Sequence, residues 1–491
     1  MGVLSRGLRQ NSVTIGVVAL WLGFVLLAGA IALERYWSFS QPLGLDNAYF
    51  FQRVWQEVFL EEPTRTLLNT EVGHGIWGGR HVEPVLWMTV PFVAASPRME
   101  TLLLIQVATV GIGVFAAFGL ARQCIEDHLA SLLLAAAWIC QPGIWDLATT
   151  DFRSLNLSVG FVALAWWGWL AGRSGWALAA GLFAMACREE VVWLVLSGMP
   201  FVVLAQPKGR RLRVGLMFLG AGLGWLGLLH LTQQTPSDFM SFRDAPHAVV
   251  GAFGGFEWSA GLEESSPGGA LSQLQAATGA GFWLIPLTPF ASLPIAVSWL
   301  GKAVNPGVAG PWAYHLWAVA LATMALVSAL GVARIGRAVQ RVRGGDWGLR
   351  CTRALAGAIL VIQVQNLRAQ MADYWESVPG VLAGERVPST RLGTPWEAIL
   401  KLPDEVPVLT EAYFVAQQAN RAVVYAVDDF QDPAQQASVL SAVEWVLLRK
   451  NHEWMPRIEA AGFVPYAEGG AARLHRRNHA PGASLNPMTP R

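Results

Sequence analysis

Apolar stretches long enough to cross a lipid bilayer recur along the chain and are separated by short polar segments. The first runs from Ser12 to Leu33 and is almost uncharged. A membrane-spanning helix needs about 20 predominantly apolar residues, and several stretches approach this length. Further spans are predicted at 99–121, 129–145, 155–171, 175–186, 191–205, 214–231 and 313–332, with a weaker one at 354–364. The pattern therefore predicts a mainly α fold, a polytopic transmembrane helical bundle.

Two other apolar segments are interrupted by proline and do not fit this pattern. The segments 82–97 and 283–300 each contain three prolines, and proline disrupts a helix interior because it lacks an N–H group. We expect the first to be re-entrant or interfacial and the second to form a broken hairpin. Non-helical backbone at membrane depth is tolerated only where protein or a water-filled cavity receives it. A cavity on the outer side of the bundle is thus predicted.

Lysine and arginine residues gather in two clusters, and these predict the orientation of the chain. One cluster lies within 208–213 and the other within 334–353. Because cytoplasmic loops of membrane proteins carry an excess of Lys and Arg, both clusters are expected in the cytoplasm. Basic residues also precede the first span, which no small-residue cleavage site follows, so we expect an uncleaved signal anchor with a cytoplasmic N-terminus. The external loops are then 34–98 and 232–280.

The segment 366–477 differs in character from the preceding transmembrane domain, 1–365. Short β-branched and apolar runs, such as AVVYAV at 422–427, alternate with helix-like pieces, which is typical of a small α/β domain. A pair of glycines near its end indicates the turn of a terminal hairpin. By the parity of the spans this C-terminal domain is extracytoplasmic. The proline-containing tail 478–491 is expected to be disordered.

The composition supports the membrane assignment and excludes other classes of protein. Of the 491 residues, 53% are hydrophobic and 14% are charged, against about 25% charged in an average soluble protein. The net charge of +1 gives no support for nucleic-acid binding. The four cysteines lie in or beside apolar segments without paired spacing, which argues against a disulfide framework or a zinc site.

A polar segment follows the first span directly and contains the strongest catalytic candidate. The sequence LDNAYFFQRVW at 45–55 is amphipathic and carries Asp46, Gln52 and Arg53. Ionisable groups held close to a bilayer are costly, so they are functional candidates by default. Asp46 suits a general base that accepts a proton from an acceptor hydroxyl. The alternative is a helix cap, because Asp is a preferred residue at the start of a helix.

Two further groups of charged residues are candidates for binding a head group. Arg80, His81 and Glu83 precede the first proline-containing segment, and His and Glu two apart on an extended chain point the same way. They could share a metal or a phosphate-bound cation, or form a solvated interfacial cluster. Asp151 and Arg153 could bind a metal-phosphate head group, or form a surface ion pair with each other.

Arg188, Glu189 and Glu190 are three consecutive charges between two apolar runs. Such charges are costly unless they face a polar cavity or lie at the water interface, so a binding role and a short interfacial turn are the two hypotheses. His315 lies within WAYHLW at the outer end of a span. An interfacial belt of Trp and Tyr alone would explain its neighbours.

Taken in order, these motifs resemble a family of uncharacterised bacterial multi-pass membrane proteins that carry a domain of unknown function. This family is similar to the GT-C superfamily of glycosyltransferases that use polyprenyl-phosphate sugars. The resemblance covers about 13–476. The motifs are Asp46, Gln52 and Trp55 in D-x5-Q-x2-W, His81 to Pro84 in H-x-x-P, the pair Asp151–Phe152, the pair Glu189–Glu190 after a basic residue, and Tyr314–His315.

The resemblance implies a function for some of these residues. In GT-C enzymes a carboxylate in the first external loop is the catalytic residue, and the sugar donor is a polyprenyl-phosphate lipid that enters from the membrane. Carried over, this makes Asp46 the catalytic candidate and Asp151 a second acidic participant. The chain departs from the family at Arg153–Ser154, where the family commonly has His-Pro. The contact with the head group at this point is therefore expected to differ or to be lost.

The sequence thus predicts a GT-C-like transferase of the bacterial cytoplasmic membrane. A sugar would move from a lipid-linked donor to an acceptor on the outer face, and fixed cations would stabilise the leaving phosphate. A transporter or flippase of a lipid-linked or polar solute is the alternative, as is a non-catalytic envelope scaffold. A divalent cation, Mg²⁺ or Mn²⁺, is an open expectation. The cation candidates are Arg53, Arg80, Arg153 and Arg188, and the metal-ligand candidates are Asp46, Asp151 and Glu189.

Overall fold

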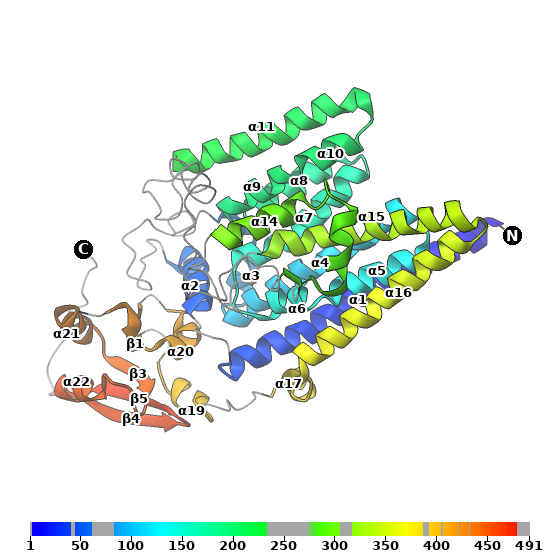
Figure 1. Ribbon diagram of the computed structural model, residues 1–491. Helices are drawn as coiled ribbons and strands as arrows, with labels where there is room; N and C mark the ends of the chain where they lie inside the picture. Colours follow the sequence, from blue (N-terminus) through cyan, green and yellow to red (C-terminus); the bar gives the residue numbers. More distant parts are fainter. Residues whose placement is uncertain are drawn as a thin grey trace, which may run out of the picture.

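A computed structural model shows a long helical bundle with a small mixed sheet at one end (Figure 1). This confirms the predicted fold class of a helical bundle followed by an α/β C-terminal part. The residues that the structure describes are 2–40, 45–60, 83–232, 274–275, 278–304, 317–385, 392–403, 406–421, 423–430 and 432–478.

Among the described residues, four helices are long and apolar enough to cross a membrane. They are residues 14–37 of α1 (Gly2–Trp37), α4 (Met99–Ile125), α15 (Ala318–Arg343) and α16 (Trp347–Gln370). A fifth span is formed if α5 (His128–Ile139) and α6 (Pro142–Thr149) are counted together, although they are bent by 50°. Pro142 begins α6 at the bend, where its missing N–H costs nothing.

Shorter helices complete the bundle and follow the predicted boundaries closely. The predicted spans 155–171 and 175–186 correspond to α7 (Ser154–Leu170) and α8 (Ser174–Met185). The predicted span 191–205 is divided into two helices at Gly198, two residues before Pro200. The remaining helices of this part are α9 (Glu189–Ser197), α10 (Met199–Ala205) and α11 (Lys208–Thr232).

The proline-containing segments form short helices, none of which is long enough by itself to cross a membrane. The first is the 3₁₀ helix η1 (Pro84–Met88) followed by α3 (Val90–Ala95), and the second is the 3₁₀ helix η3 (Gly279–Leu287) followed by α14 (Leu293–Val304). The weak span predicted at 354–364 is instead part of the longer α16, which continues past residue 365 to Gln370.

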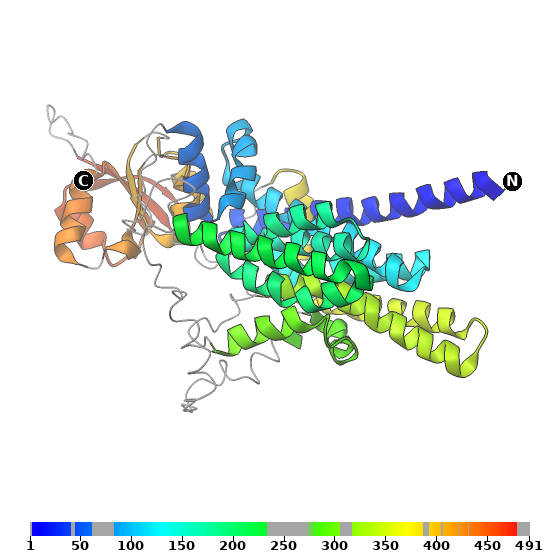
Figure 2. The same cartoon turned by 90° about the horizontal axis from the view of Figure 1, so that it is seen from above.

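Both basic clusters lie toward the end of the bundle where α1 begins. Figure 1 shows the start of α11 and the turn between α15 and α16 on the side of the N-terminus. Helix α2 (Leu45–Phe59) and the sheet lie at the opposite end, and Figure 2 shows the same separation from above. The two basic clusters thus lie at one end of the bundle, and their location in the cytoplasm stays a prediction.

The C-terminal part contains a five-stranded sheet with strand order β2-β1-β3-β5-β4. Strand β1 pairs in parallel with β2 and β3, whereas β5 pairs antiparallel with β3 and β4. The predicted terminal hairpin is β4–β5. The strands are β1 (Val408–Thr410), β2 (Val424–Ala426), β3 (Trp445–Arg449), β4 (Phe463–Gly469) and β5 (Ala472–Arg477).

Short helices connect the bundle to the sheet and cover both faces of the sheet. Helices α17 (Ala372–Trp375) and α18 (Val378–Leu382) follow α16 and contact α1. The elements that cover the sheet are α19 (Trp396–Ile399), α20 (Ala412–Val415), η6 (Ala416–Gln418), η7 (Val427–Asp429), α21 (Pro433–Ala442) and α22 (Met455–Ala460).

Aromatic side chains fix the sheet against the end of α1. The indole N–H of Trp396 donates to the carbonyl oxygen of Trp37 at 2.8 Å. Phe39 packs against both Trp396 and Phe414, with ring centroids 5.3 and 5.7 Å apart. Because α2 also contacts α20 and η6, the helix that carries Asp46 is held between the bundle and the sheet.

Candidate functional site

Helix α2 presents its two charged candidates on one face. Asp46 and Arg53 are seven residues apart, which is close to two helical turns, so their side chains lie on the same side of the helix. The side chain of Asp46 is 41% exposed, whereas that of Arg53 is 2% exposed. One face of α2 thus carries an accessible carboxylate and a buried guanidinium.

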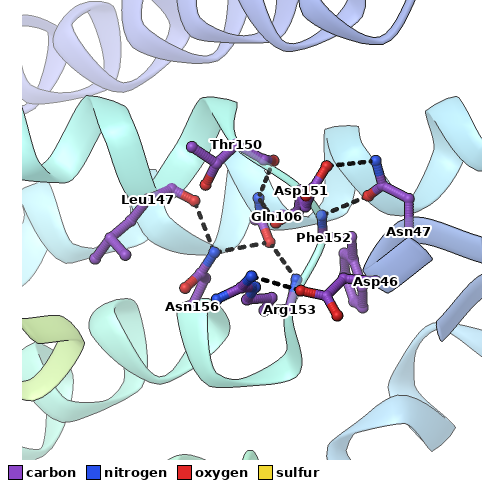
Figure 3. A network of polar contacts seen from close by, with 9 residues as sticks. All are labelled: Asp46, Asn47, Gln106, Leu147, Thr150, Asp151, Phe152, Arg153 and Asn156. Carbon is purple, nitrogen blue, oxygen red and sulfur yellow. Dashed lines mark hydrogen bonds and ion pairs between the residues drawn. The ribbon is translucent and has the colours of Figure 1, made fainter. Parts of the chain in front are cut away.

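Asp46 forms an ion pair with Arg153. Arg153 Nη2 lies 2.5 Å from Asp46 Oδ2 (Figure 3). Arg153 immediately precedes α7, and its backbone N–H donates to Gln106 Oε1 at 2.9 Å. The alternative of a surface ion pair between Asp151 and Arg153 is therefore wrong, because Arg153 pairs with the carboxylate of Asp46 on α2.

Asp151 is buried beside this pair and is held by Asn47. Asn47 Nδ2 donates to Asp151 Oδ1 at 3.0 Å, and the backbone N–H of Phe152 donates to Asn47 Oδ1 at 2.6 Å. Asp151 is 5% exposed and Asn47 is fully buried. Residue 47 therefore fixes the loop between α6 and α7 to the first turn of α2, as Figure 3 shows.

Gln106, on α4, connects to the same loop from the other side. Its Nε2 donates to the carbonyl oxygen of Thr150 at 3.2 Å, and its Oε1 accepts from Arg153 N–H. Asn156 Nδ2 donates to the carbonyl oxygen of Leu147 at 3.0 Å. Buried backbone polar groups need partners, and these two amides supply them in the interior of the bundle (Figure 3).

The environment of Asp151 shifts its titration toward neutral pH. Burial, and after it the negative charge of Asp46, raise the pKa of this carboxyl to about 7, while Arg153 and Arg35 oppose the shift. The site therefore holds two carboxylates in different environments, one accessible and one buried. Different environments give neighbouring carboxylates different chemical roles.

A second ion pair on the same face of α2 is fully buried. Arg53 Nη1 lies 2.5 Å from Glu83 Oε2, and the exposed fractions of the two side chains are 2% and 1%. Ser154 Oγ donates to Glu83 Oε1 at 2.5 Å, and the Arg53 guanidinium lies 5.0 Å from the ring of Tyr49. The alternative of a solvated cluster is therefore wrong for Glu83, which binds protein groups in the interior.

The two residues at which the chain departs from the family pattern both belong to these networks. Arg153 is bound by Asp46 from α2, and Ser154 is bound by Glu83, which Arg53 of α2 holds in turn. The start of α7 is thus attached to α2 twice, through consecutive residues. Arg153 brings a cation to the position where the head-group contact was expected to change.

Arg35 adds a further cation near the end of α1. Its Nη1 donates to Thr149 Oγ1 at 2.9 Å and lies 3.8 Å from Asp146 Oδ1. Its guanidinium also lies 5.1 Å from the ring of Tyr374. Arg35 thus connects α1 to α6 and α17 beside the loop that contains Asp151.

The other predicted site residues have mixed outcomes. Gln52 is buried on α2. Arg188 is partly buried and directly precedes α9. Glu189 and Glu190 begin α9, but their side chains lie outside the described part of the structure, as do all of Arg80, His81 and His315.

The described residues do not by themselves supply a divalent-cation site. No group of three His, Cys, Asp or Glu side chains among them is suited to hold a metal ion. Asp46 and Asp151 are bound by a guanidinium and an amide, whereas a hard cation takes about six or more oxygen ligands. A divalent ion with Glu189 as a ligand stays a prediction.

An apolar pocket lies in another part of the bundle. Its walls come from α7, α8, α9 and α11 and include Ala165, Trp169 and Phe218. Ala165 and Trp169 lie in the last two turns of α7, whereas the polar network surrounds its first turn. This pocket is therefore distinct from the polar network, and the cavity expected on the outer side stays a prediction.

The sequence interpretation missed Asn47, Gln106, Asn156 and Arg35. All four are polar residues within or next to apolar helices, and a polar side chain at membrane depth is itself a functional signal. Gln106 and Asn156 each interrupt an apolar run of α4 or α7. That signal would have identified both of them.

The sequence of this chain matches a known family, and its fold is similar to solved structures. Residues 44–461 match the family described as "Predicted membrane protein (DUF2079)". The crystal structure of ArnT from Cupriavidus metallidurans in the apo state is similar with a TM-score of 0.53 at 11% identity, over 94% of this chain and 98% of that chain. The structure of the same ArnT bound to undecaprenyl phosphate has a TM-score of 0.45 at 14% identity, over 93% of this chain and 97% of that chain. No curated protein matches the chain.

Proposed function

The chain belongs to the DUF2079 family of predicted membrane proteins, and from this premise we propose that it is a membrane glycosyltransferase of the GT-C type. It transfers a sugar from a polyprenyl-phosphate donor to an extracytoplasmic acceptor. The observation that carries the proposal is the accessible Asp46, paired with Arg153 above a buried polar network.

The fold supports the choice of donor. The bundle and the C-terminal sheet together resemble apo ArnT over almost the full length of both chains. ArnT is a GT-C glycosyltransferase, and it has been solved bound to undecaprenyl phosphate. A polyprenyl phosphate is therefore the donor lipid that we propose for this chain, and it would reach Asp46 laterally from the membrane.

The geometry suits a single displacement at the sugar. Asp46 accepts a proton from the acceptor nucleophile, whose lone pair forms the new bond to the anomeric carbon. The bond from that carbon to the phosphate oxygen breaks, and its electron pair leaves with the polyprenyl phosphate. Arg153 pairs with Asp46, and its side chain is 22% exposed. Its guanidinium stabilises the charge on the leaving phosphate.

The proposed orientation in the membrane places this chemistry on the outer face. We propose a location in the bacterial cytoplasmic membrane, with the start of α1 in the cytoplasm and the sheet outside. A reporter fused after Arg476 should be external, and one inserted near Arg343 should be cytoplasmic, because Arg343 lies in a basic cluster. A cytoplasmic signal from both fusions would contradict this orientation.

Transfer activity tests the role of Asp46 directly. Membranes that contain the protein are supplied with a radiolabelled polyprenyl-phosphate sugar, and the transfer of label to envelope material is followed. We expect Asp46→Asn to reduce the rate by about 10²–10⁴-fold, which is the usual contribution of a general base, while the protein stays folded in the membrane.

Asp127 offers a matched control for this experiment. It forms an ion pair with Arg353 at 2.8 Å, and it lies beside the α4–α5 turn, away from α2. Asp127→Asn should leave the transfer rate unchanged. A wild-type rate in Asp46→Asn would show that Asp46 only supports the start of α2, and the proposed role would then be dropped.

The proposal of a divalent cation rests on Glu189 and Glu190, which begin α9. A carboxylate does not attract a phosphate directly and has to act through a cation. We expect Glu189→Gln or Glu190→Gln to weaken donor binding or metal dependence without unfolding the protein. If a chelator leaves the wild-type rate unchanged, the reaction proceeds without a dissociable metal ion.

A further inference from the structure

The C-terminal sheet has the topology in which open α/β proteins place a ligand. Its parallel part has the order β2-β1-β3. The connection from β1 therefore leads to a strand on one side of β1, and the connection from β2 leads to a strand on the other side of β1. In sheets of this order, ligands bind outside the carboxyl ends of β1 and β3, where the connections diverge. The carboxyl ends of these two strands are thus the place to search for a second site.

The segments that follow β1 and β3 leave the sheet on different faces, as this type of binding site requires. Phe414 and Val415, in the connection from β1 to β2, pack in the core that continues into the bundle. Val439 and Leu440, in the connection from β2 to β3, pack in a separate core on the other face of the sheet. Ile458, in the helix after β3, belongs to that second core as well. The chain therefore leaves the carboxyl ends of β1 and β3 on opposite faces.

A cluster of polar side chains lies at the carboxyl ends of β1 and β3. Glu411 directly follows β1 and is 2% exposed, and Arg449 is the last residue of β3. The backbone N–H of Arg449 donates to Glu411 Oε1 at 2.7 Å, and Arg449 Nε donates to Glu411 Oε2 at 2.8 Å. The guanidinium lies 4.8 Å from the ring of Tyr413. Both oxygens of the buried carboxylate are thus used to orient one arginine.

His452 completes the cluster. Its Nδ1 accepts from the backbone N–H of Trp454 at 3.2 Å, so the ring proton lies on Nε2. This Nε2 is 3.6 Å from Glu411 Oε2. Burial raises the pKa of Glu411 against the effect of Arg449 and His452.

The cluster presents part of a guanidinium to solvent. The side chain of Arg449 is 44% exposed, and within the described residues its two terminal nitrogens have no hydrogen-bond acceptor. An arginine that is fixed through Nε and stacked on an aromatic ring retains a forked pair of N–H groups. That geometry matches the two oxygens of a carboxylate or a phosphate.

We propose that the carboxyl ends of β1 and β3 form an oxyanion-binding site in which Arg449 binds a carboxylate or phosphate group. Glu411 and Tyr413 position the guanidinium, and His452 borders the site. The inference is independent of the proposed transfer reaction, because it uses no residue of the network around Asp46.

Direct binding to the full-length protein tests this proposal. The purified protein, in lipid nanodiscs, is titrated calorimetrically with glucose 1-phosphate, glucuronate and uncharged glucose as separate probes. We expect at least one anionic probe to bind in the millimolar range or tighter, and glucose not to bind. The phosphate and carboxylate arms distinguish the two sources of the oxyanion.

Arg476 supplies a matched control for Arg449. It pairs with Glu444 at 3.2 Å, stacks on Trp445 at 5.3 Å and is 50% exposed, but Glu444 directly precedes β3, at the amino end of that strand. Arg449→Gln should weaken binding about tenfold or more, since hydrogen bonds to charged groups are strong. Arg476→Gln should leave binding unchanged.

Arg449→Lys is a second variant that controls for misfolding of Arg449→Gln, because it keeps a positive charge next to Glu411. This variant should stay folded and bind more weakly than the wild type, since a lysine lacks the fork. The proposal is overturned if neither anionic probe binds the wild-type protein, if glucose binds equally well, or if Arg449→Lys and Arg476→Gln affect binding to the same extent.

Discussion

Two ion pairs on the same face of α2 have the same chemistry and the same length but opposite surroundings. Asp46 with Arg153 and Arg53 with Glu83 both have a closest distance of 2.5 Å between nitrogen and oxygen. The first pair is 41% and 22% exposed, and the second is 1–2% exposed. The exposed pair is accessible to a substrate, whereas the buried pair is part of the interior.

The difference teaches which pair can take part in chemistry. An exposed ion pair contributes about 0–1 kcal/mol to stability, so it can open and re-form when a ligand arrives. Breaking a buried pair leaves an uncompensated charge, which costs about 3–5 kcal/mol. We therefore assign reaction chemistry to Asp46 and Arg153, and we assign the positioning of α7 relative to α2 to Arg53 and Glu83.

The largest expected effect on stability comes from breaking the buried pair. Glu83→Gln should lower the free energy of unfolding by about 3–5 kcal/mol, because it leaves the Arg53 charge buried without a counter-charge. Chemical unfolding of the purified protein in detergent measures this. The double variant Arg53→Met/Glu83→Gln should regain part of the loss, and a double variant that is less stable than the single one would contradict the assignment.

Removal of the exposed cation should act on activity. Arg153→Gln should lower the transfer rate by about 10²–10³-fold, which is typical for one group that stabilises developing charge, with a stability change below about 1 kcal/mol. Arg173, which directly precedes α8, provides a control whose substitution by Gln should not change the rate. Equal loss in both variants would mean that Arg153 acts through general electrostatics.

The amide that holds the buried carboxylate should have an intermediate effect. Asn47→Ala removes the donor to Asp151 and the acceptor of Phe152 N–H, so it should destabilise the protein by about 1–3 kcal/mol. Thermal unfolding followed by circular dichroism measures this. Thr101→Ala, which removes an exposed hydrogen bond to Ser96, should have little effect, and similar losses in the two variants would contradict the role of Asn47.

The smallest expected effect, taken per pH unit, is a pH dependence that originates from Asp151. Its pKa is raised from 3.8 to about 7, so between these values the folded protein retains a proton that the unfolded chain releases. The free energy of unfolding should therefore fall as pH rises through this window, by at most about 1.4 kcal/mol per pH unit. Asp151→Asn should flatten this slope, and an unchanged slope would assign it to other groups.

Much of the fold could be predicted from local sequence. Apolar runs gave the positions of α1, α4, α7 and α8, and alternating β-branched runs gave the strands of the C-terminal sheet, because both signals depend on neighbours only a few residues away. The length of α16 was underestimated since its arginines mask its hydrophobicity. The prolines of 82–97 coincide with its division into two short helices, and a re-entrant or interfacial position of this segment stays a prediction.

The sequence by itself determined that this is a polytopic membrane protein with a C-terminal α/β part and with a carboxylate, Asp46, directly after the first span. The composition and the length of the apolar runs carry that information, because a run of about 20 apolar residues is long enough to cross a bilayer. Only the tertiary structure decided the partners: Arg153 binds Asp46 and not its neighbour Asp151, and Glu83 is buried against Arg53. Those choices depend on how distant helices pack, and packing places a side chain near groups that no local pattern specifies.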